Sequence, residues 1–282
     1  MVRIAGVIII YNPSSSVIEN ILSYCNDVDE LYIMDNSATS NSFISDKLSH
    51  SNLIYLHDGE NKGIAKRLNH AANMAAARGF LWLLTMDQDS YFKEGVLNQY
   101  KEVINTYSYK DQTAIFGVNY TKENKTTNQL KEVPLLITSG SILNLKAMKS
   151  IGFFDENLFI DEVDSEYCYR ARIRHYKIIE CSQIFLHHHL GEIQLGRSLK
   201  SGRLTLRRLH APVRLYYMVR NYFYVLKKLP QISEADKKEM KRGLLIRIKN
   251  NIIYNQKRFQ VIKYILKGYL DFKKNKMGKI SS

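Results

Sequence analysis

The chain has 282 residues, of which 45% are hydrophobic, so it can build a packed core and disorder is not expected. Its three cysteines are odd in number and lack metal-type spacing, which predicts neither a disulfide framework nor a zinc knuckle and favours a reducing compartment. The net charge of +14 at pH 7 indicates an anionic partner.

The positive charge is concentrated in the C-terminal third of the chain. Residues 196–282 contain 23 Lys and Arg against 4 Asp and Glu, whereas residues 1–195 carry a net charge of −5. This asymmetry predicts a polyanionic partner for the tail, either nucleic acid or an anionic lipid surface. The N-terminal residues show no signal-peptide pattern, and no apolar run approaches the roughly 20 residues that cross a bilayer, so we expect a cytoplasmic protein that does not span a membrane.

Strands and helices are predicted to alternate along the N-terminal part of the chain. The expected strands are continuous apolar runs, which are typical of a parallel sheet covered on both faces, at 4–11, 31–34, 52–56, 80–86 and 114–118. The expected helices show apolar residues at helical spacing and lie at 17–25, 64–78 and 95–107. The sequence therefore predicts an α/β fold with a mostly parallel sheet, and the polar segment 121–131 is expected to be a loop or hairpin tip.

A basic helical region is expected after a boundary near residue 200, so that the domains cover 1–200 and 201–282. Within it, apolar residues recur at three and four spacing among Lys and Arg at 203–229 and 244–272, which predicts amphipathic helices. Such helices can lie in the headgroup layer of an anionic membrane. The alternatives are packing on the first domain or on a second subunit in a homodimer. Nucleic acid is not an expected partner, because residues 1–195 are net negative and repel it.

Polar side chains follow the predicted strands at the edge where ligands bind in such sheets. They are Asn12, Asp35, Asp58 and Asp87. The strongest signal is Asp87-Gln88-Asp89, in which two carboxylates follow an apolar strand directly. Since Mg²⁺ and Mn²⁺ prefer oxygen ligands and share them with substrate phosphates, this pair predicts a metal site that holds a diphosphate. A solvated turn is the alternative explanation of such a pair.

Three further segments accompany this pair: Tyr11-Asn12-Pro13, Asp35-Asn36-Ser37 and Asn61-Lys62-Gly63. Taken alone, each of the last two also fits an ordinary turn or helix entry. Together, and in this order, the four segments resemble glycosyltransferase family 2 over roughly residues 4–190, with Asp87-Gln88-Asp89 resembling the family's metal motif. The resemblance implies a GT-A fold and a nucleoside-diphosphate sugar as donor.

The resemblance also implies roles for individual residues. Asp35 is implied to recognise the base, and Asn61 and Gly63 to lie near the nucleoside. The implied nucleotide-sugar site consists of Tyr11, Asn12, Asp35, Asp58, Asn61, Gly63, Asp87, Gln88, Ser139 and Gly140. The implied ligands of Mg²⁺ or Mn²⁺ are Asp87, Asp89 and His188. An ordinary sheet turn explains Ser139-Gly140 equally well, and in the run 187–189 at most one or two histidines can face a common site, because strand residues alternate sides.

Four carboxylates crowd residues 161–166, and such crowding costs stability unless it serves a purpose. An inverting sugar transfer needs one carboxylate to accept the proton of the acceptor hydroxyl. Counting back from Cys168-Tyr169-Arg170, the resemblance implies Asp164 as this base. Asp161 remains the alternative, because Val163 departs from the family's usual Glu. A solvated acidic helix start would also explain the cluster.

Four segments together resemble the bacterial rhamnosyltransferase subgroup of the family. They are the Asp-Gln-Asp motif, residues 159–166, the His-x-Leu-Gly segment and residues 216–221. This resemblance implies dTDP-L-rhamnose as donor and a lipid-linked or polysaccharide acceptor at the inner face of the cell membrane, in cell-surface polysaccharide synthesis. The alternatives are a UDP-sugar donor carrying galactofuranose or another hexose, and a nucleotidyltransferase. The last would release pyrophosphate, but residues 11–14 offer no Lys or Arg for a triphosphate.

Overall fold

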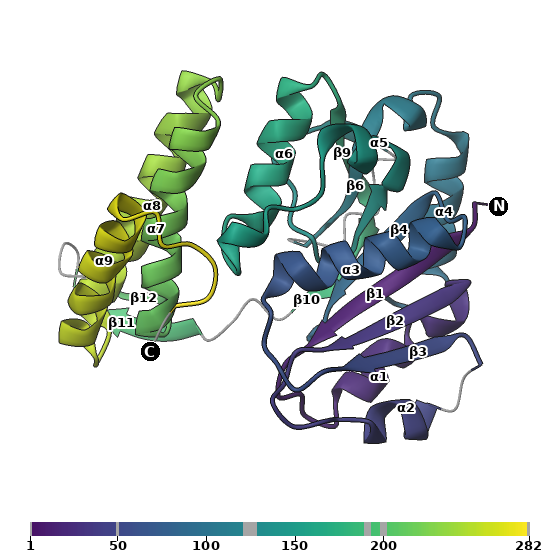
Figure 1. Ribbon diagram of the computed structural model, residues 1–282, viewed down its shortest axis with the longest axis horizontal. Coiled ribbons are helices and arrows are strands. Elements are labelled where there is room, and N and C mark those ends of the chain that lie inside the picture. The colour runs from purple at the N-terminus through teal and green to yellow at the C-terminus, as the bar shows by residue number, and fades with distance from the viewer. Residues whose placement is uncertain (1, 49–50, 121–128, 189–192, 198–201, 281–282) are drawn as a thin grey trace. The chain divides into compact units, whose positions relative to one another are not determined.

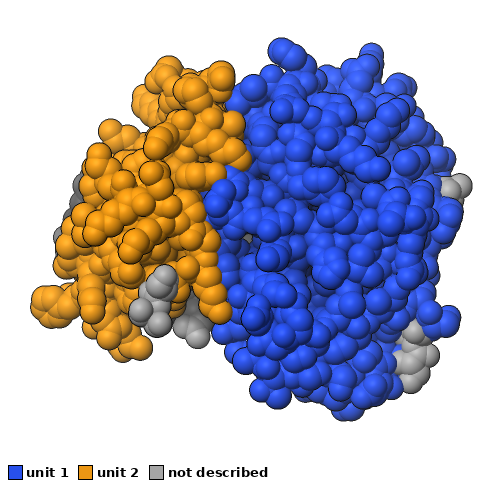
Figure 2. Space-filling view, viewed as in Figure 1, with its two compact units in different colours: residues 1–159, 163–189 blue, residues 160–162, 190–282 orange. Residues whose placement is uncertain are grey.

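The computed structural model describes residues 2–48, 51–120, 129–188, 193–197 and 202–280 (Figure 1). It divides into two compact units (Figure 2). Unit 1 comprises Met1–Phe159 and Val163–His189, and unit 2 comprises Ile160–Glu162 and Leu190–Ser282. The sequence predicted one boundary near residue 200, whereas here a short segment from the middle of the chain groups with the C-terminal unit.

Unit 1 is built on an eight-stranded sheet with the strand order β3-β2-β1-β4-β8-β6-β9-β7. The strands are β1 (Ile4–Ile10), β2 (Glu30–Asp35), β3 (Leu53–His57), β4 (Trp82–Asp87), β6 (Thr113–Asn119), β7 (Leu130–Glu132), β8 (Ser141–Asn144) and β9 (Lys177–Phe185). Strands β3, β2, β1 and β4 are mutually parallel, and β6 is parallel to β9. Strand β8 runs antiparallel between β4 and β6, and β7 runs antiparallel to β9. The predicted α/β fold with a mostly parallel sheet is confirmed.

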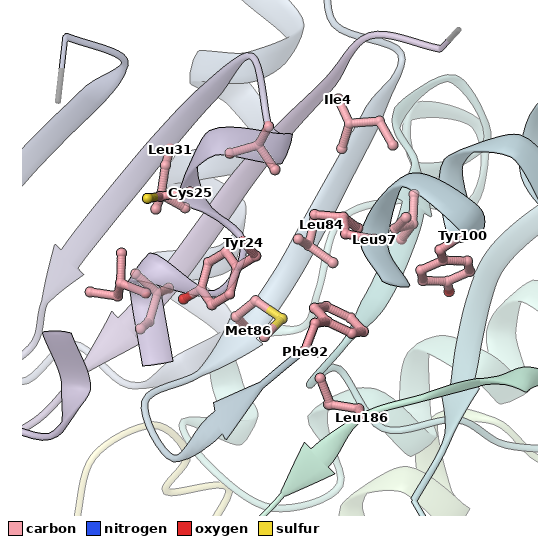
Figure 3. Close-up of a cluster of buried hydrophobic side chains, with 14 of the residues drawn as sticks. Ile4, Tyr24, Cys25, Leu31, Leu84, Met86, Phe92, Leu97, Tyr100 and Leu186 are labelled. Atoms are coloured by element: carbon pink, nitrogen blue, oxygen red, sulfur yellow. The ribbon is translucent and has the colours of Figure 1, made fainter. Parts of the chain in front are cut away.

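Helices cover both faces of the sheet. Helix α3 (Ile64–Ala77) packs on β1, β2 and β4. The opposite face packs a cluster that includes side chains of α1 (Val17–Leu22), α2 (Phe43–Leu48) and α4 (Val96–Thr106). Figure 3 shows part of this cluster, including Leu97 and Tyr100 of α4. Along β1, Ile4 and Ile8 enter this cluster while Ala5 and Val7 are buried on the other side. Both faces of β1 are therefore apolar, which explains its continuous apolar run.

Two more helices, α5 (Leu145–Ile151) and α6 (Val163–Ile173), complete unit 1. A two-stranded ladder pairs β5 (Ser90–Tyr91) with β10 (His187–His188). Short helical turns lie at Cys25–Asp27, Lys110–Gln112 and Glu156–Leu158. The sequence did not predict the six-residue helix α2 or the two-residue strands, because so few residues carry little periodic signal.

Unit 2 contains three helices and a hairpin. The helices are α7 (Pro212–Lys228), α8 (Glu234–Tyr254) and α9 (Arg258–Lys273), and their apolar cluster includes Leu215, Val219, Leu244 and Val261. The hairpin pairs β11 (Ile193–Arg197) with β12 (Leu204–Arg208). The predicted helix at 203–229 is therefore wrong over its first part. Leu204 and Leu206 are two residues apart, which is the period of a strand. In the described part of the chain, no helix has the length and hydropathy of a membrane span.

Helix α9 approaches α7 closely at Gly268. A Cβ atom built on Gly268 would lie 2.5 Å from the carbonyl oxygen of Tyr216, a backbone atom that cannot move aside alone. By contrast, a Cβ on Gly243 in α8 would meet only the guanidinium of Arg247, at 3.5 Å. The two helical glycines thus differ in packing while sharing the same backbone cost relative to alanine.

We expect Gly268→Ala to lower the free energy of unfolding by about 1–3 kcal/mol, because the added methyl group overpacks the α7–α9 contact. Gly243→Ala should raise it by up to about 1 kcal/mol, because alanine favours the helix and fits the available space. Urea unfolding followed by far-UV circular dichroism measures both. Equal shifts in the two variants would contradict the close contact at Gly268.

Candidate active site

The carboxyl ends of β1, β2 and β4 lie side by side because the three strands are parallel neighbours. The ladder pairs Ile9 with Asp87 and Ile10 with Asp35. The polar segments that follow these strands therefore meet at one edge of the sheet. The backbone amide of Tyr11 donates to the side-chain oxygen of Gln88 at 2.8 Å, and the amide of Asn12 donates to Ser37 at 2.7 Å. These bonds tie the turn after β1 to its two neighbours.

Asp87, Asp89 and His188 form a cluster with metal-ligand chemistry. One ligand atom from each lies within 4.8 Å of the others. The pairing of β10 with β5 brings His188 opposite Ser90, and its Nδ1 lies 3.3 Å from Asp89 Oδ1. Two carboxylates and one imidazole suit Mn²⁺ well and Mg²⁺ through the carboxylates. The residues thus fit the divalent ion that the sequence predicted.

Ser90 and Ser139 form hydrogen bonds that hold residues of this cluster in position. Ser90 Oγ lies 2.6 Å from Nδ1 of His188 and 2.8 Å from Oγ of Ser139. Ser139 Oγ in turn accepts from the backbone amide of Asp87 at 3.3 Å. Both serines are buried, so these bonds orient the imidazole and the Asp87 turn. Gly140 has φ +69°, and a Cβ there would lie 2.7 Å from Leu186, so the turn needs glycine.

A cleft of about 550 Å³ opens beside Asp89 and Gln88. Its other walls come from Pro13, Ser14, Ser16, Val17, Glu19, Asn20 and Tyr91. Asn20 donates from its side chain to the Gln88 carbonyl at 2.8 Å, which fixes one wall. A cleft of this size can admit a small ligand such as part of a sugar nucleotide.

Asp35 is fully buried at the end of β2. Its carboxylate accepts hydrogen bonds from the Tyr55 hydroxyl at 2.5 Å, from the Ser37 amide at 2.9 Å and from both nitrogens of Asn41. Burial alone would raise the pKa of Asp35, but these hydrogen bonds outweigh it and hold the pKa below its ordinary value. Asp35 is therefore ionised at neutral pH and fixes the loop that follows it.

A second network joins the ends of β2 and β3 to the start of α3. Arg67 is 3% exposed and donates two bonds to Asp58, at 2.9 and 2.6 Å, and a third to the Asn36 side-chain oxygen. The Arg67 bonds hold the pKa of Asp58 far below its usual range. Asn36 donates to Asn61 at 2.9 Å, so Asp58 and Asn61 belong to this network, whereas Asp35 bonds to Ser37, Asn41 and Tyr55. Gly63 has φ +81°, and a Cβ there would lie 2.6 Å from the Phe159 carbonyl oxygen.

The acidic cluster at 161–166 is divided among different partners. In unit 2, Arg214 donates two bonds to Asp161, at 2.8 and 2.6 Å. In unit 1, Glu166 is fully buried and accepts two bonds from Arg170. Both oxygens of Asp161 are thus engaged by Arg214, and Asp164 lies in the first turn of α6.

Tyr120 contacts His188 of the metal-type cluster and also lies within electrostatic range of Asp164. Its hydroxyl donates to the Ser139 carbonyl, and its ring meets the His188 ring edge-on at 6.1 Å. Burial raises the pKa of Tyr120 well above its ordinary value, and the negative charges of Asp87 and Asp164 raise it further. The phenol therefore lies within the electrostatic range of both carboxylates and stays protonated.

A family model described as "Glycosyl transferase family 2" matches residues 7–179, more than half of the chain. The chain belongs to glycosyltransferase family 2. The match covers the Asp87-Gln88-Asp89 turn, Ser139 and Asp164, so the predicted family is confirmed over the segments that suggested it.

Relatives agree with this membership. The chain is 26% identical to "dTDP-rhamnosyl transferase RfbF" of Shigella flexneri in an alignment of 250 positions, which covers 80% of each chain. S. aureus TarS in complex with UDP-GlcNAc superposes with a TM-score of 0.61 at 16% identity, over 96% of this chain and 80% of that one. GalNAc-T7 with UDP, GalNAc and Mn²⁺ superposes with a TM-score of 0.58 at 14% identity, over 90% and 56%. At 16% and 14% identity, the similarity to these two solved structures shows the GT-A fold alone.

The sequence did not single out Asn36, Arg67, Ser90 or Tyr120 as site residues. A single Arg on an Ala-rich helix or a Tyr at a strand end carries no local signal. Arg67 becomes informative only when its 3% exposure and its bidentate bond to Asp58 are known. The one available signal was the position of Ser90 directly after Asp89.

Replacing Asp89 by Asn or His188 by Ala should weaken Mn²⁺ binding, because each change removes a ligand atom of the cluster. We expect a loss of about tenfold or more per variant, which corresponds to about 1.4 kcal/mol of coordination energy. Calorimetric titration of Mn²⁺ into protein with a nucleoside diphosphate measures the affinity. Asp111→Asn is the matched control, since Asp111 is exposed and outside the cluster. Unchanged Mn²⁺ affinity in both site variants would remove this cluster as the ion site.

Proposed function

We propose that the protein is an inverting, metal-dependent glycosyltransferase that moves L-rhamnose from dTDP-L-rhamnose to a lipid-linked or polysaccharide acceptor. The observation that carries the proposal is the Asp87–Asp89–His188 cluster beside a polar cleft, in a chain of glycosyltransferase family 2. Similarity to a dTDP-rhamnosyl transferase supports rhamnose as the sugar. A UDP-sugar donor is the alternative, supported by the fold shared with a UDP-GlcNAc complex.

The metal-type cluster supports Mn²⁺ or Mg²⁺ as the cofactor, with Asp87, Asp89 and His188 as its ligands. A divalent cation at this position would supply positive charge for the diphosphate leaving group. The protein's own contribution is to hold the ligands in place. Ser90 and Ser139 orient the imidazole and the Asp87 turn, so little rearrangement is needed when the donor binds.

Asp164 is the proposed general base. It would take the proton from the acceptor hydroxyl as that oxygen attacks the anomeric carbon from the face opposite the diphosphate. Burial and the negative charges of Asp87 and Asp164 raise the pKa of Tyr120, so both carboxylates lie within electrostatic range of one neutral phenol. Asp161 takes the other role in the acidic cluster, as the partner of Arg214.

The remaining predicted residues have positional roles in this proposal. Asp35 and Asn61 are proposed to position the nucleoside, and hydrogen bonds join Asp35 to Asn41 and Asn61 to Asn36. Asp58 reaches the same network through Arg67. Tyr11, Asn12 and Gln88 line the edge where the turn after β1 meets the Asp87 turn. Ser139 and Gly140 are buried and form the turn that supports the Asp87–Asp89–His188 cluster.

The acceptor side of the proposal places the protein at the cytoplasmic face of a membrane as a peripheral protein. The support is the concentration of positive charge in unit 2, since 23 of the 41 Lys and Arg lie in residues 196–282. Anionic lipids attract such segments by about 1 kcal/mol per well-placed Lys or Arg. Nucleic acid is not proposed as a partner.

The donor is tested by calorimetry with dTDP, UDP and GDP, each with and without Mn²⁺. We expect dTDP to bind most tightly and its affinity to fall when Mn²⁺ is left out. Preference for UDP would keep the enzyme class and change the donor sugar. If none of the three binds, sugar-nucleotide transfer is not the activity. Turnover assays should release nucleoside diphosphate, whereas release of pyrophosphate would indicate a nucleotidyltransferase.

Asp164→Asn should lower kcat by about 10² to 10⁴, the usual contribution of a general base, while donor affinity stays within about twofold. Asp161→Asn is the matched control, because it makes the same chemical change in the same acidic cluster. We expect this control to keep most of its turnover. A variant pair in which Asp161→Asn is inactive and Asp164→Asn is active would reverse the assignment of the base.

A further inference from the structure

Helix α9 carries apolar side chains on two sides. One side packs within unit 2, where Val261 is fully buried and Gly268 lies against the Tyr216 backbone. On the same side, Asp271 accepts a hydrogen bond from the Tyr216 hydroxyl at 2.9 Å and one from Lys267 at 3.1 Å. These contacts cover one apolar face of α9 and do not involve its second apolar face.

The other side of α9 is an exposed apolar stripe. Phe259 is 78% exposed, Ile262 40%, Leu266 58% and Leu270 53%. The spacing of three and four residues puts these four side chains on one line along the helix. A shallow groove of about 620 Å³ runs beside them. Large apolar side chains that remain exposed as a continuous stripe mark an interaction surface.

Basic side chains border this stripe. Lys263, Lys274 and Lys276 are exposed and line the same groove. Residues 257–282 contain eight Lys and Arg, and Asp271 is their one acidic residue. Since Asp271 is 8% exposed and accepts bonds from Tyr216 and Lys267, it contributes little negative charge at the surface. The surface therefore combines an apolar centre with a positive border.

We propose that the exposed stripe of α9 inserts into the headgroup layer of an anionic lipid bilayer, with Lys263, Lys274 and Lys276 bound to lipid phosphates. Apolar side chains on one line of a cationic helix bind in this way by burying area and by attraction to anionic lipids. A second copy of the chain fits less well, because a symmetric contact would bring the two rows of lysines together. A nucleic acid fits less well too, because three of the four stripe residues are aliphatic and offer no ring for bases to stack on.

This inference rests on the proposed function, since it names the surface that would bring the enzyme to a lipid-linked acceptor. Its readouts are nevertheless independent of catalysis. The donor site and the stripe belong to different units, so each can be tested in the full-length protein while the other is monitored.

The first experiment places a fluorescent reporter on the stripe. Trp82 is the chain's one tryptophan and is 5% exposed, so a new tryptophan dominates any change in emission. Phe259→Trp should shift its emission to shorter wavelength with vesicles of phosphatidylglycerol and phosphatidylethanolamine in equal parts, and brominated acyl chains should quench it. Vesicles of phosphatidylcholine alone should give little shift. Leu81→Trp, at a site in unit 1 that is 59% exposed, is the matched control and should not respond.

The second experiment measures co-sedimentation with the same anionic vesicles. Phe259→Ser with Leu266→Ser should reduce the partition coefficient at least tenfold. Lys263→Gln with Lys274→Gln should reduce it about 25-fold at low salt, since about 1 kcal/mol per charge corresponds to about fivefold each. Lys146→Gln with Lys149→Gln removes the same charge from exposed positions in unit 1 and should leave binding unchanged.

Several results would overturn the proposal. One is an unshifted Phe259→Trp spectrum with anionic vesicles. Another is a wild-type dimer in light scattering that Phe259→Ser with Leu266→Ser converts to monomer, which would assign the stripe to a second copy. Oligonucleotide binding that the lysine variants abolish, without vesicle binding, would assign it to nucleic acid. Calorimetry with dTDP and Mn²⁺ separates the two hypotheses, because the stripe variants should bind the nucleotide as wild type does.

Discussion

The parallel pairing of β1 with β2 on one side and β4 on the other is the constraint on which the candidate site depends. Backbone hydrogen bonds fix this register, so Ile9 lies beside Asp87 and Ile10 beside Asp35. Three polar turns are thereby brought to one edge of the sheet, where the side chains of Gln88 and Ser37 tie them together. The apolar packing on both faces of the sheet holds the strands, and with them the polar turns at their ends, in place.

Fixed partners distinguish the acidic residues of this protein from one another. Asp35 accepts four hydrogen bonds from its own loop and Tyr55, Asp58 pairs with Arg67, and Glu166 pairs with Arg170. These carboxylates hold neighbouring segments in place: Asp58 and Glu166 pair with guanidinium groups, whereas Asp35 is held by neutral hydrogen-bond donors. Asp87 and Asp89 instead gather with an imidazole at a cleft, where their negative charge suits a cation. Residue type does not explain this difference between structural and ligand-type carboxylates, because all of them are Asp or Glu close to strand ends or helix starts. The difference comes from the groups that the fold places beside each one.

Unit 2 shows the same separation of structural and interaction surfaces. Its helices bury one apolar face in a small shared cluster, while α9 keeps a second apolar stripe exposed. A helix that served packing alone would carry polar residues on its outer face. The exposed stripe therefore calls for a function outside the fold of unit 2, and the surrounding lysines restrict what that function can be.

The sequence by itself determined the fold class, most strands of the parallel core and the family, because these depend on local patterns: continuous apolar runs, helical spacing and short motifs directly after strands. It also pointed to His188 as a partner of Asp87 and Asp89, although only by resemblance. The tertiary structure decided which distant residues meet. Arg214 binds Asp161 across 53 positions, and Ser90 bonds to His188 across 98. Local sequence patterns do not predict such pairs, because the pairs form only when the strand order brings distant segments of the chain together. For the same reason Leu204 and Leu206 were expected in a helix, whereas pairing with 193–197 makes their segment a strand.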